Sequence, residues 1–283
     1  MGIYDNKPKC FLERLYFKEA GNLTQNIYCA GFEIGAWRCA PFASHLVEWL
    51  PEYALPEEEL NVNHGNMYVK LKQAAIRVYT SPKYERRGEC GEIAIHAICR
   101  EYFQTLPISP RVFYKSTSND VIKAFDMVHA RFPQSGGIEL WLGESKLYTD
   151  TASAIAEAIK SVSDHLEKGF LKNQKLFLGP QIPKTTPHYD ELMELFHPQT
   201  SLDKFLSSAV FVVGILSDSK ATIAAKLIDD GYKATLKTEL IEISKKLDAS
   251  GLPNKVRIAL LYVPLATKEA LVTEFDSNLK GLQ

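Results

Sequence analysis

Two short and almost wholly apolar runs in the C-terminal half limit the folds open to this chain. They are Ala209 to Leu216 and Val256 to Val263. Runs of this length without alternation are typical of strands that are buried on both faces. Neither approaches the roughly 20 residues that a membrane-spanning helix needs. With a helical stretch at Thr238 to Leu247 between them, they predict an α/β fold with a mixed β-sheet flanked by helices.

A hairpin and two helices precede these runs. Apolar spacing predicts a helix over Gly91 to Phe103 and a clearer one over Ala152 to Leu166, for which Asp150 or Thr151 can serve as the N-cap. Between the helices lie three strand candidates, of which the last two are joined by the turn sequence Pro-Gln-Ser-Gly-Gly: Val112 to Ser116, Ala124 to Phe132 and Ile138 to Tyr148. The last two are expected to form an antiparallel hairpin.

The first 84 residues form a mainly helical N-terminal extension in this interpretation. Cys10 to Phe17 and Ile27 to Phe32 show weak strand patterns, and Pro41 to Leu50 shows a helical one. A second amphipathic helix has Met67, Leu71, Ala74, Ala75 and Val78 along one face. We place a soft domain boundary near residue 84, which divides an accessory region, 1–84, from a core, 85–283.

Composition excludes several other classes of protein. The five cysteines occur singly, so neither a zinc module nor a disulfide framework is indicated. The polar N-terminus carries no apolar signal core, so we expect a soluble cytoplasmic protein without a membrane anchor. A formal net charge of −1 gives no global signature of nucleic-acid binding, so any phosphate-binding surface must be local.

The hairpin carries the residues with the clearest chemistry. Glu144 and Lys146 lie two apart near the end of the second strand, so their side chains point to the same face. Asp126 lies in the first strand, and antiparallel pairing would bring it beside Glu144. Two carboxylates held together repel unless a cation neutralises them, and their oxygen atoms suit Mg²⁺, for which Mn²⁺ can substitute. With a lysine beside the metal, the predicted reaction is phosphodiester hydrolysis.

Asp/Glu-x-Lys alone is a weak signal, because the chain also contains Asp5-Asn6-Lys7 and Asp218-Ser219-Lys220. Neither of these has an acid on a neighbouring strand. Only the pair at 144 and 146 has the hairpin context.

Glu92 is a further candidate ligand, because it falls on the stripe of its helix that should face the sheet. It is either a metal ligand or water-positioning group, or an exposed first-turn acid favoured by the helix dipole. Glu89 precedes the helix and is expected to be solvated. His129 should lie on the opposite strand face from Asp126 as a packed core histidine, and His96 shares the Glu92 face, where a simple hydrogen-bonded pair explains it equally well.

A basic stretch just before the Glu92 helix is the best local candidate for binding DNA phosphates. A run of charged residues is more often simply a solvent-exposed surface. This stretch could equally be a docking surface for a protein partner. Its basic residues are Lys70, Lys72, Arg77, Lys83, Arg86 and Arg87.

Three stretches carry a resemblance to known proteins: Gly88 to Ile93, Phe125 to His129 and Leu142 to Tyr148. Their pattern resembles the restriction-endonuclease-like, or PD-(D/E)xK, superfamily. It consists of an acid on a helix, an acid in one strand, Glu-Ser-Lys in the next strand and an alanine-rich helix after it. More specifically, the stretches look like HamA, the family of nuclease subunits of the bacterial Hachiman anti-phage system. Phe125 stands where the nominal motif has proline, a departure that is common in the superfamily.

The resemblance implies a DNA nuclease that a helicase partner, HamB, restrains until infection. It also implies metal ligation by Asp126 and Glu144, catalysis by Lys146 and a supporting role for Glu92. Three alternatives stay open at this point, one of which is that the Glu-Ser-Lys tripeptide is a surface coincidence in another kind of α/β protein. The other two keep a link to nucleic acids. One is a stand-alone restriction or repair endonuclease, and the other is a non-catalytic nucleic-acid-binding scaffold that keeps a nuclease fold.

Overall fold

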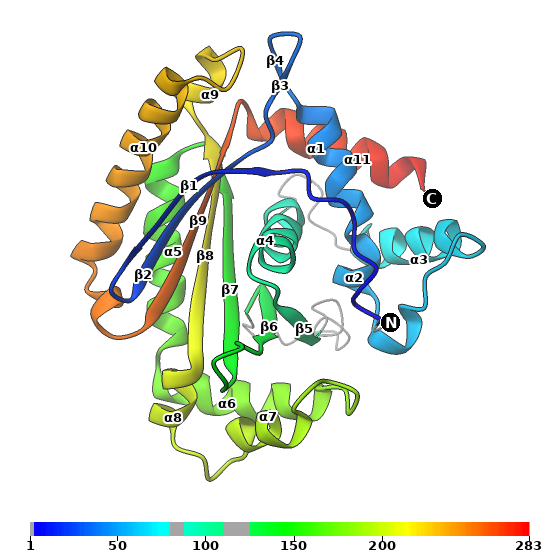
Figure 1. Ribbon diagram of the computed structural model, residues 1–283, viewed down its shortest axis with the longest axis vertical. Coiled ribbons are helices and arrows are strands. Elements are labelled where there is room, and N and C mark those ends of the chain that lie inside the picture. Colours follow the sequence, from blue (N-terminus) through cyan, green and yellow to red (C-terminus); the bar gives the residue numbers. More distant parts are fainter. Residues whose placement is uncertain (1–2, 80–87, 110–124, 283) are drawn as a thin grey trace.

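A mixed β-sheet forms the centre of the molecule (Figure 1). The computed structural model describes residues 3–79, 88–109 and 125–282. Within them, seven strands pair in the order β1-β2-β9-β8-β7-β6-β5. Strands β2, β9, β8 and β7 run parallel, whereas β1, β6 and β5 are antiparallel to their neighbours. The strands are β1 (Glu13–Ala20), β2 (Leu23–Cys29), β5 (Leu106–Ser109), β6 (Met127–Arg131), β7 (Glu139–Tyr148), β8 (Ala209–Asp218) and β9 (Arg257–Leu265). The predicted fold class is confirmed.

Helices cover both faces of the sheet. Figure 1 shows α5 and α10 on one face and α4, α1 and α11 on the other. A small ribbon of β3 (Phe32–Glu33) and β4 (Ala36–Trp37) stands apart. The α-helices are α1 (Cys39–Glu48), α2 (Leu50–Ala54), α3 (Met67–Tyr79), α4 (Glu89–Tyr102), α5 (Thr151–His165), α6 (Lys168–Leu178), α7 (Tyr189–Phe196), α8 (Leu202–Ser208), α9 (Lys220–Ala224), α10 (Asp230–Ala249) and α11 (Lys268–Gly281).

Strands β8 and β9 lie in the middle of the sheet. Nearly all their side chains are buried, because helices cover both sides of these strands. Consecutive residues therefore point to opposite faces of the sheet and belong to two different hydrophobic clusters, one on each face, as Val212 and Val213 do. This burial on both faces explains the apolar runs in the sequence, and both predicted strands are confirmed.

Helix α5 connects β7 to the helices that lead into β8. It begins at the predicted N-cap, Asp150, whose carboxylate accepts a hydrogen bond from the Ser153 N–H. Its buried face is rotated from the predicted one and consists of Ala154, Ile155, Ala158, Val162 and His165. Of the residues predicted to be buried, Ala152, Ala156 and Ser163 are exposed. The predicted buried face was wrong because alanine and serine occur on both the buried and the exposed faces of helices.

The N-terminal extension is part of the central sheet. β1 and β2 form a hairpin around Gly21 and Asn22, and β2 then pairs in parallel with β9 from the opposite end of the chain. The two weakly predicted strands are therefore present, although their bounds are shifted. The proposed boundary at residue 84 lies outside the described residues and stays a prediction.

Some predicted features cannot be compared with the structure. The strand candidate Val112 to Ser116 lies outside the described residues. Strand β5 and the helices α6 and α7 were not predicted from the sequence. In the part of the chain that the structure describes, no helix is both long and apolar enough to cross a membrane.

Candidate active site

The β6–β7 hairpin brings Asp126 beside the Glu144 segment. The strands are antiparallel, with Met127 opposite Gly143. Asp126 lies one residue before β6, not within it as predicted, but its N–H continues the strand pairing by donating to the Gly143 carbonyl over 2.8 Å. Its carboxylate accepts a hydrogen bond from the Ser145 N–H, also over 2.8 Å. The acid is therefore fixed to the second strand by both its backbone and its side chain.

Glu144 and Lys146 share the face of β7 that is turned toward α5. Two earlier residues of the same parity, Leu140 and Leu142, belong to the hydrophobic cluster on that side. The Lys146 ammonium Nζ lies 2.7 Å from Glu144 Oε1. Glu144 is 7% exposed, so this ion pair lies largely inside the protein. The predicted common face is confirmed.

The surroundings of Glu144 change the pKa of its carboxyl group. Burial raises the pKa of Glu144, and the nearby Asp126 carboxylate raises it further, while Lys146 and a hydrogen bond from Ser161 act in the opposite direction. For Lys146, burial acts to lower the pKa, but the attraction of Glu144 outweighs it and the net shift is upward. The site thus favours a protonated lysine, and it disfavours the ionised form of Glu144.

Helix α5 supplies a histidine that the sequence did not single out. His165 Nδ1 lies 3.8 Å from Glu144 Oε2, on the far side of the carboxylate from Lys146. Its ring stacks on Phe170 at 4.4 Å and meets Phe125 edge to face at 4.7 Å between centroids. Phe125, at the motif's proline position, therefore helps to hold His165. His165 follows Ile155, Ala158 and Val162 at helical spacing. A correct assignment of the buried face of α5 would therefore have placed His165 on the side of the helix that packs against the sheet.

Glu92 comes from a helix, α4, that packs on the face of the sheet opposite to α5, and its partner Tyr53 lines a small pocket with Asp126. The α4 residues over β7 and β8 are Gly91 and Ile95. Glu92 is half-buried, and its carboxylate accepts a hydrogen bond from the Tyr53 hydroxyl of α2. Across residues 3–79, 88–109 and 125–282, no group of three or more His, Cys, Asp or Glu side chains is arranged to hold a metal ion. The role of Glu92 as a third ligand stays a prediction.

The matching family can now be stated beside this geometry. The family model HamA matches residues 8–279 of the chain. The chain belongs to the HamA family. It is therefore a Hachiman defence-system protein. No curated protein matches the chain.

The two core histidines of this HamA chain belong to a buried network beside Asp126, with which both line one small pocket. His129 is 1% exposed, as predicted for a packed core histidine, and its Nε2 lies 3.0 Å from His96 Nδ1. His96 also lies 3.3 Å from Glu52, which Arg100 pairs with as well. Burial lowers the pKa of His129 well below its usual value, helped by the nearby His96 and Arg100. The ring is therefore neutral at physiological pH.

The basic stretch predicted to bind DNA is only partly described. Lys70, Lys72 and Arg77 lie on α3, and all three are half-buried. Arg77 pairs with Glu59, with Nη2 2.8 Å from Oε1, so part of its charge is neutralised within the HamA chain. Lys83, Arg86 and Arg87 lie outside the described residues. DNA binding by this stretch stays a prediction.

Proposed function

We propose that this HamA-family protein is a metal-dependent DNA nuclease of the PD-(D/E)xK type and the effector of its defence system. The observation that carries the proposal is the arrangement of Asp126, Glu144 and Lys146. The two acids lie close enough to raise the pKa of Glu144, and the lysine ammonium lies 2.7 Å from Glu144. This combination of charges suits metal-assisted phosphodiester hydrolysis.

The side chains suit Mg²⁺, with Mn²⁺ as a substitute. Carboxylate oxygens are hard ligands, and Mg²⁺ is commonly held by one or two carboxylates together with water and substrate phosphates. Asp126 and Glu144 are the two residues that would hold it. The unfavourable interaction between their charges is the physical reason for a cation there, because a cation would relieve it.

The chain's own residues have separate tasks in this mechanism. When bound, the cation would polarise the scissile phosphate and acidify a water molecule. The Ser145 N–H fixes the Asp126 carboxylate by a hydrogen bond of 2.8 Å. Lys146 keeps its proton, since its pKa is raised, and so provides a fixed positive charge for the phosphate oxygens as negative charge develops on them. Within this mechanism it acts as an electrostatic stabiliser and not as a base.

Restraint by a helicase partner of the HamB kind is part of the proposal. Its support is membership of the HamA family, through the resemblance to nuclease subunits of the Hachiman system. An unrestrained DNA nuclease would damage the host genome, so a subunit with this activity needs control. DNA phosphates would bind through local basic residues, with Lys70 and Lys72 as the described candidates.

Cleavage of supercoiled plasmid tests the nuclease. Purified protein is incubated with Mg²⁺, Mn²⁺ or EDTA, and the wild type is compared with Glu144→Ala and Lys146→Ala. We expect nicking or degradation with either metal, none in EDTA, and a loss of about 100-fold or more in each variant, because transition-state charge stabilisation of this kind is worth that much.

Lys220→Ala is the matched control, because Lys220 is the exposed lysine of the second Asp-x-Lys sequence, at the end of β8. It should cleave as the wild type does. Equal activity in all variants would place the chemistry elsewhere. Inert wild-type protein, tested both alone and with its helicase subunit and DNA, would favour the scaffold alternative.

A further inference from the structure

A second pocket lies away from the Glu144 site, at the edge of the sheet where β7 and β9 begin. Its volume is about 400 Å³. Trp141 lines it, and this side chain belongs to the hydrophobic cluster on the α4 face, whereas Glu144 and Lys146 face α5. The lining residues come from the β1–β2 hairpin, the end of α4 and the strands β6 to β9, and they include Arg14, Phe17, Tyr102, Phe103, Arg131 and Arg257.

Three arginines from three separate strands meet at this pocket. Arg131 of β6 and Arg257 of β9 both pair with Glu139, with guanidinium nitrogen to carboxylate oxygen distances of 3.3 and 2.6 Å. Trp141 Nε1 donates a third hydrogen bond to the same carboxylate over 3.1 Å. One carboxylate therefore orients two guanidinium groups, and the pocket as a whole carries three arginines against two acids, Glu139 and Glu19. Both arginines stay more than a third exposed, so their remaining N–H groups can reach a ligand.

Aromatic rings form the other wall. The guanidinium carbon of Arg14 lies 5.0 Å from the ring centroid of Phe17 and 5.1 Å from that of Tyr102. Phe103 packs against Trp141 at 4.7 Å between centroids. Phe17 is 45% exposed, so part of its ring is open to a ligand. Flat apolar rings therefore lie beside fixed positive charge.

We propose that this pocket binds a nucleoside phosphate. Guanidinium groups held in a fixed orientation suit phosphate oxygens, and an exposed ring such as that of Phe17 can stack on a base. The volume lies within the range of small-ligand pockets. The phosphate would lie toward Arg131 and Arg257, with Arg14 between it and the base. A free nucleotide and the phosphorylated end of a DNA strand share this chemistry, and the experiment separates them.

Binding is measured by isothermal titration calorimetry on the full chain in EDTA. The probes are ATP, tripolyphosphate and a 5′-phosphorylated ten-nucleotide thymidine strand. The proteins are wild type, Arg14→Gln, Arg257→Gln and Arg38→Gln. Arg38 is the matched control, because its guanidinium also lies over a ring, that of Phe11 at 4.5 Å, but outside the pocket. Melting temperatures check that each variant is folded, and exposed Arg14 is the substitution least able to disturb folding.

The proposal expects ATP or the oligonucleotide to bind the wild type, with at least about a tenfold loss of affinity in Arg14→Gln and Arg257→Gln and none in Arg38→Gln. Binding of ATP identifies a free nucleotide, and binding of the oligonucleotide alone identifies a strand end. The absence of binding, equal binding by all variants, or tripolyphosphate binding as tightly as ATP would each overturn it. EDTA removes the metal ions that the nuclease needs, so the result is independent of the proposed cleavage activity.

Discussion

The Glu144 carboxylate lies between two cationic or potentially cationic side chains. Lys146 lies 2.7 Å from one of its oxygens, and His165 Nδ1 lies 3.8 Å from the other. The longer distance exceeds that of a hydrogen bond, so His165 acts on the carboxylate through its field and by filling space. Aromatic contacts to Phe125 and Phe170 fix the imidazole in place. His165 is thus placed to orient a proposed metal ligand.

Substitution of His165 should weaken metal binding without unfolding the protein. His165→Phe keeps a flat ring between Phe125 and Phe170 but removes the ring nitrogens. We expect the Mn²⁺ dissociation constant, measured by calorimetry, to rise by about 10-fold or more, as found when the groups around metal ligands are removed.

His165→Asn is the companion variant, because its amide nitrogen occupies a position similar to that of Nδ1. It should bind Mn²⁺ nearly as the wild type does while losing some stability through lost ring contacts. If the Phe variant binds Mn²⁺ normally, His165 only packs. If wild-type protein binds no Mn²⁺, the proposed metal site itself is wrong.

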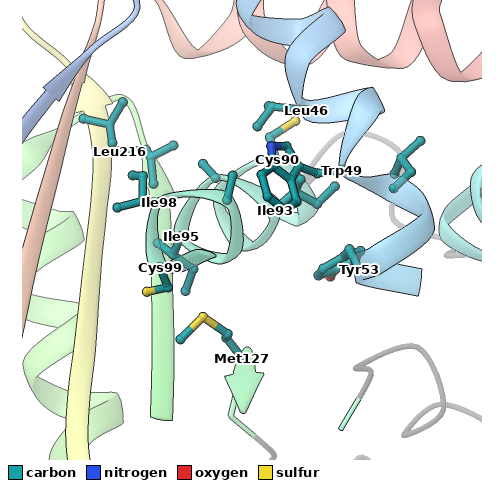
Figure 2. Close-up of a cluster of buried hydrophobic side chains, with 14 of the residues drawn as sticks. Leu46, Trp49, Tyr53, Cys90, Ile93, Ile95, Ile98, Cys99, Met127 and Leu216 are labelled. Atoms are coloured by element: carbon teal, nitrogen blue, oxygen red, sulfur yellow. The ribbon is translucent and has the colours of Figure 1, made fainter. Parts of the chain in front are cut away.

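Helix α4 packs closely against two glycines of the sheet. A Cβ added to Gly214 of β8 would lie 2.2 Å from Ile95 Cγ2, and one added to Gly143 of β7 would lie 2.9 Å from Ile95 Cδ1. Figure 2 shows Ile95 in the cluster that α4 forms with Leu46 and Trp49 of the N-terminal region, Met127 and Leu216. Glycines on two adjacent strands therefore let the helix approach. Gly143 directly precedes Glu144, so this packing also supports the candidate site.

Gly214→Ala should destabilise the protein by about 1–3 kcal/mol, because the added methyl group overpacks the contact with Ile95. Chemical denaturation followed by circular dichroism measures the free energy of unfolding. Adding Ile95→Ala should recover part of the loss caused by Gly214→Ala, which a double-mutant cycle would reveal as coupling.

Gly169→Ala is the control within a helix. Gly169 lies in α6 with no neighbouring atom within 4 Å of the added Cβ, so alanine should stabilise by up to about 1 kcal/mol. A Gly214→Ala protein as stable as the wild type would show that α4 can move away from the sheet at little cost.

At the scale of the whole molecule, the two ends of the chain are interleaved. β2 pairs along β9, and α1 packs on α11. The hydrophobic cluster around α4 includes Phe42 and Trp49 from the first 84 residues. The Glu144 site and the pocket lined by Arg14, Arg131 and Arg257 therefore both depend on a sheet to which both ends of the chain contribute strands.

A fragment of residues 85–283 should therefore fail to fold stably. Removal of β1 and β2 would leave β9 as an exposed apolar edge strand and would uncover the residues under α1 and α2. We expect aggregation or the loss of near-ultraviolet circular dichroism, with the full chain as the control. A fragment that unfolds cooperatively near the melting temperature of the full chain would show instead that the accessory region is separable.

The sequence by itself determined the features that depend on neighbouring residues. Unbroken apolar runs identified β8 and β9, capping and periodicity identified α5, and strand alternation placed Glu144 and Lys146 on one face. These predictions hold because side-chain spacing and backbone geometry repeat along the chain. They required no knowledge of distant contacts.

Only the tertiary structure decided which faces meet. It placed Glu92 against Tyr53, brought His165 to Glu144, and joined β2 to β9. Periodicity shows that a helix has an apolar face but not which element packs against it. An error of one residue in assigning that face rotates it by about 100° around the helix axis. Partners depend on the direction and length of each crossover, which contacts between distant residues determine as the sheet assembles.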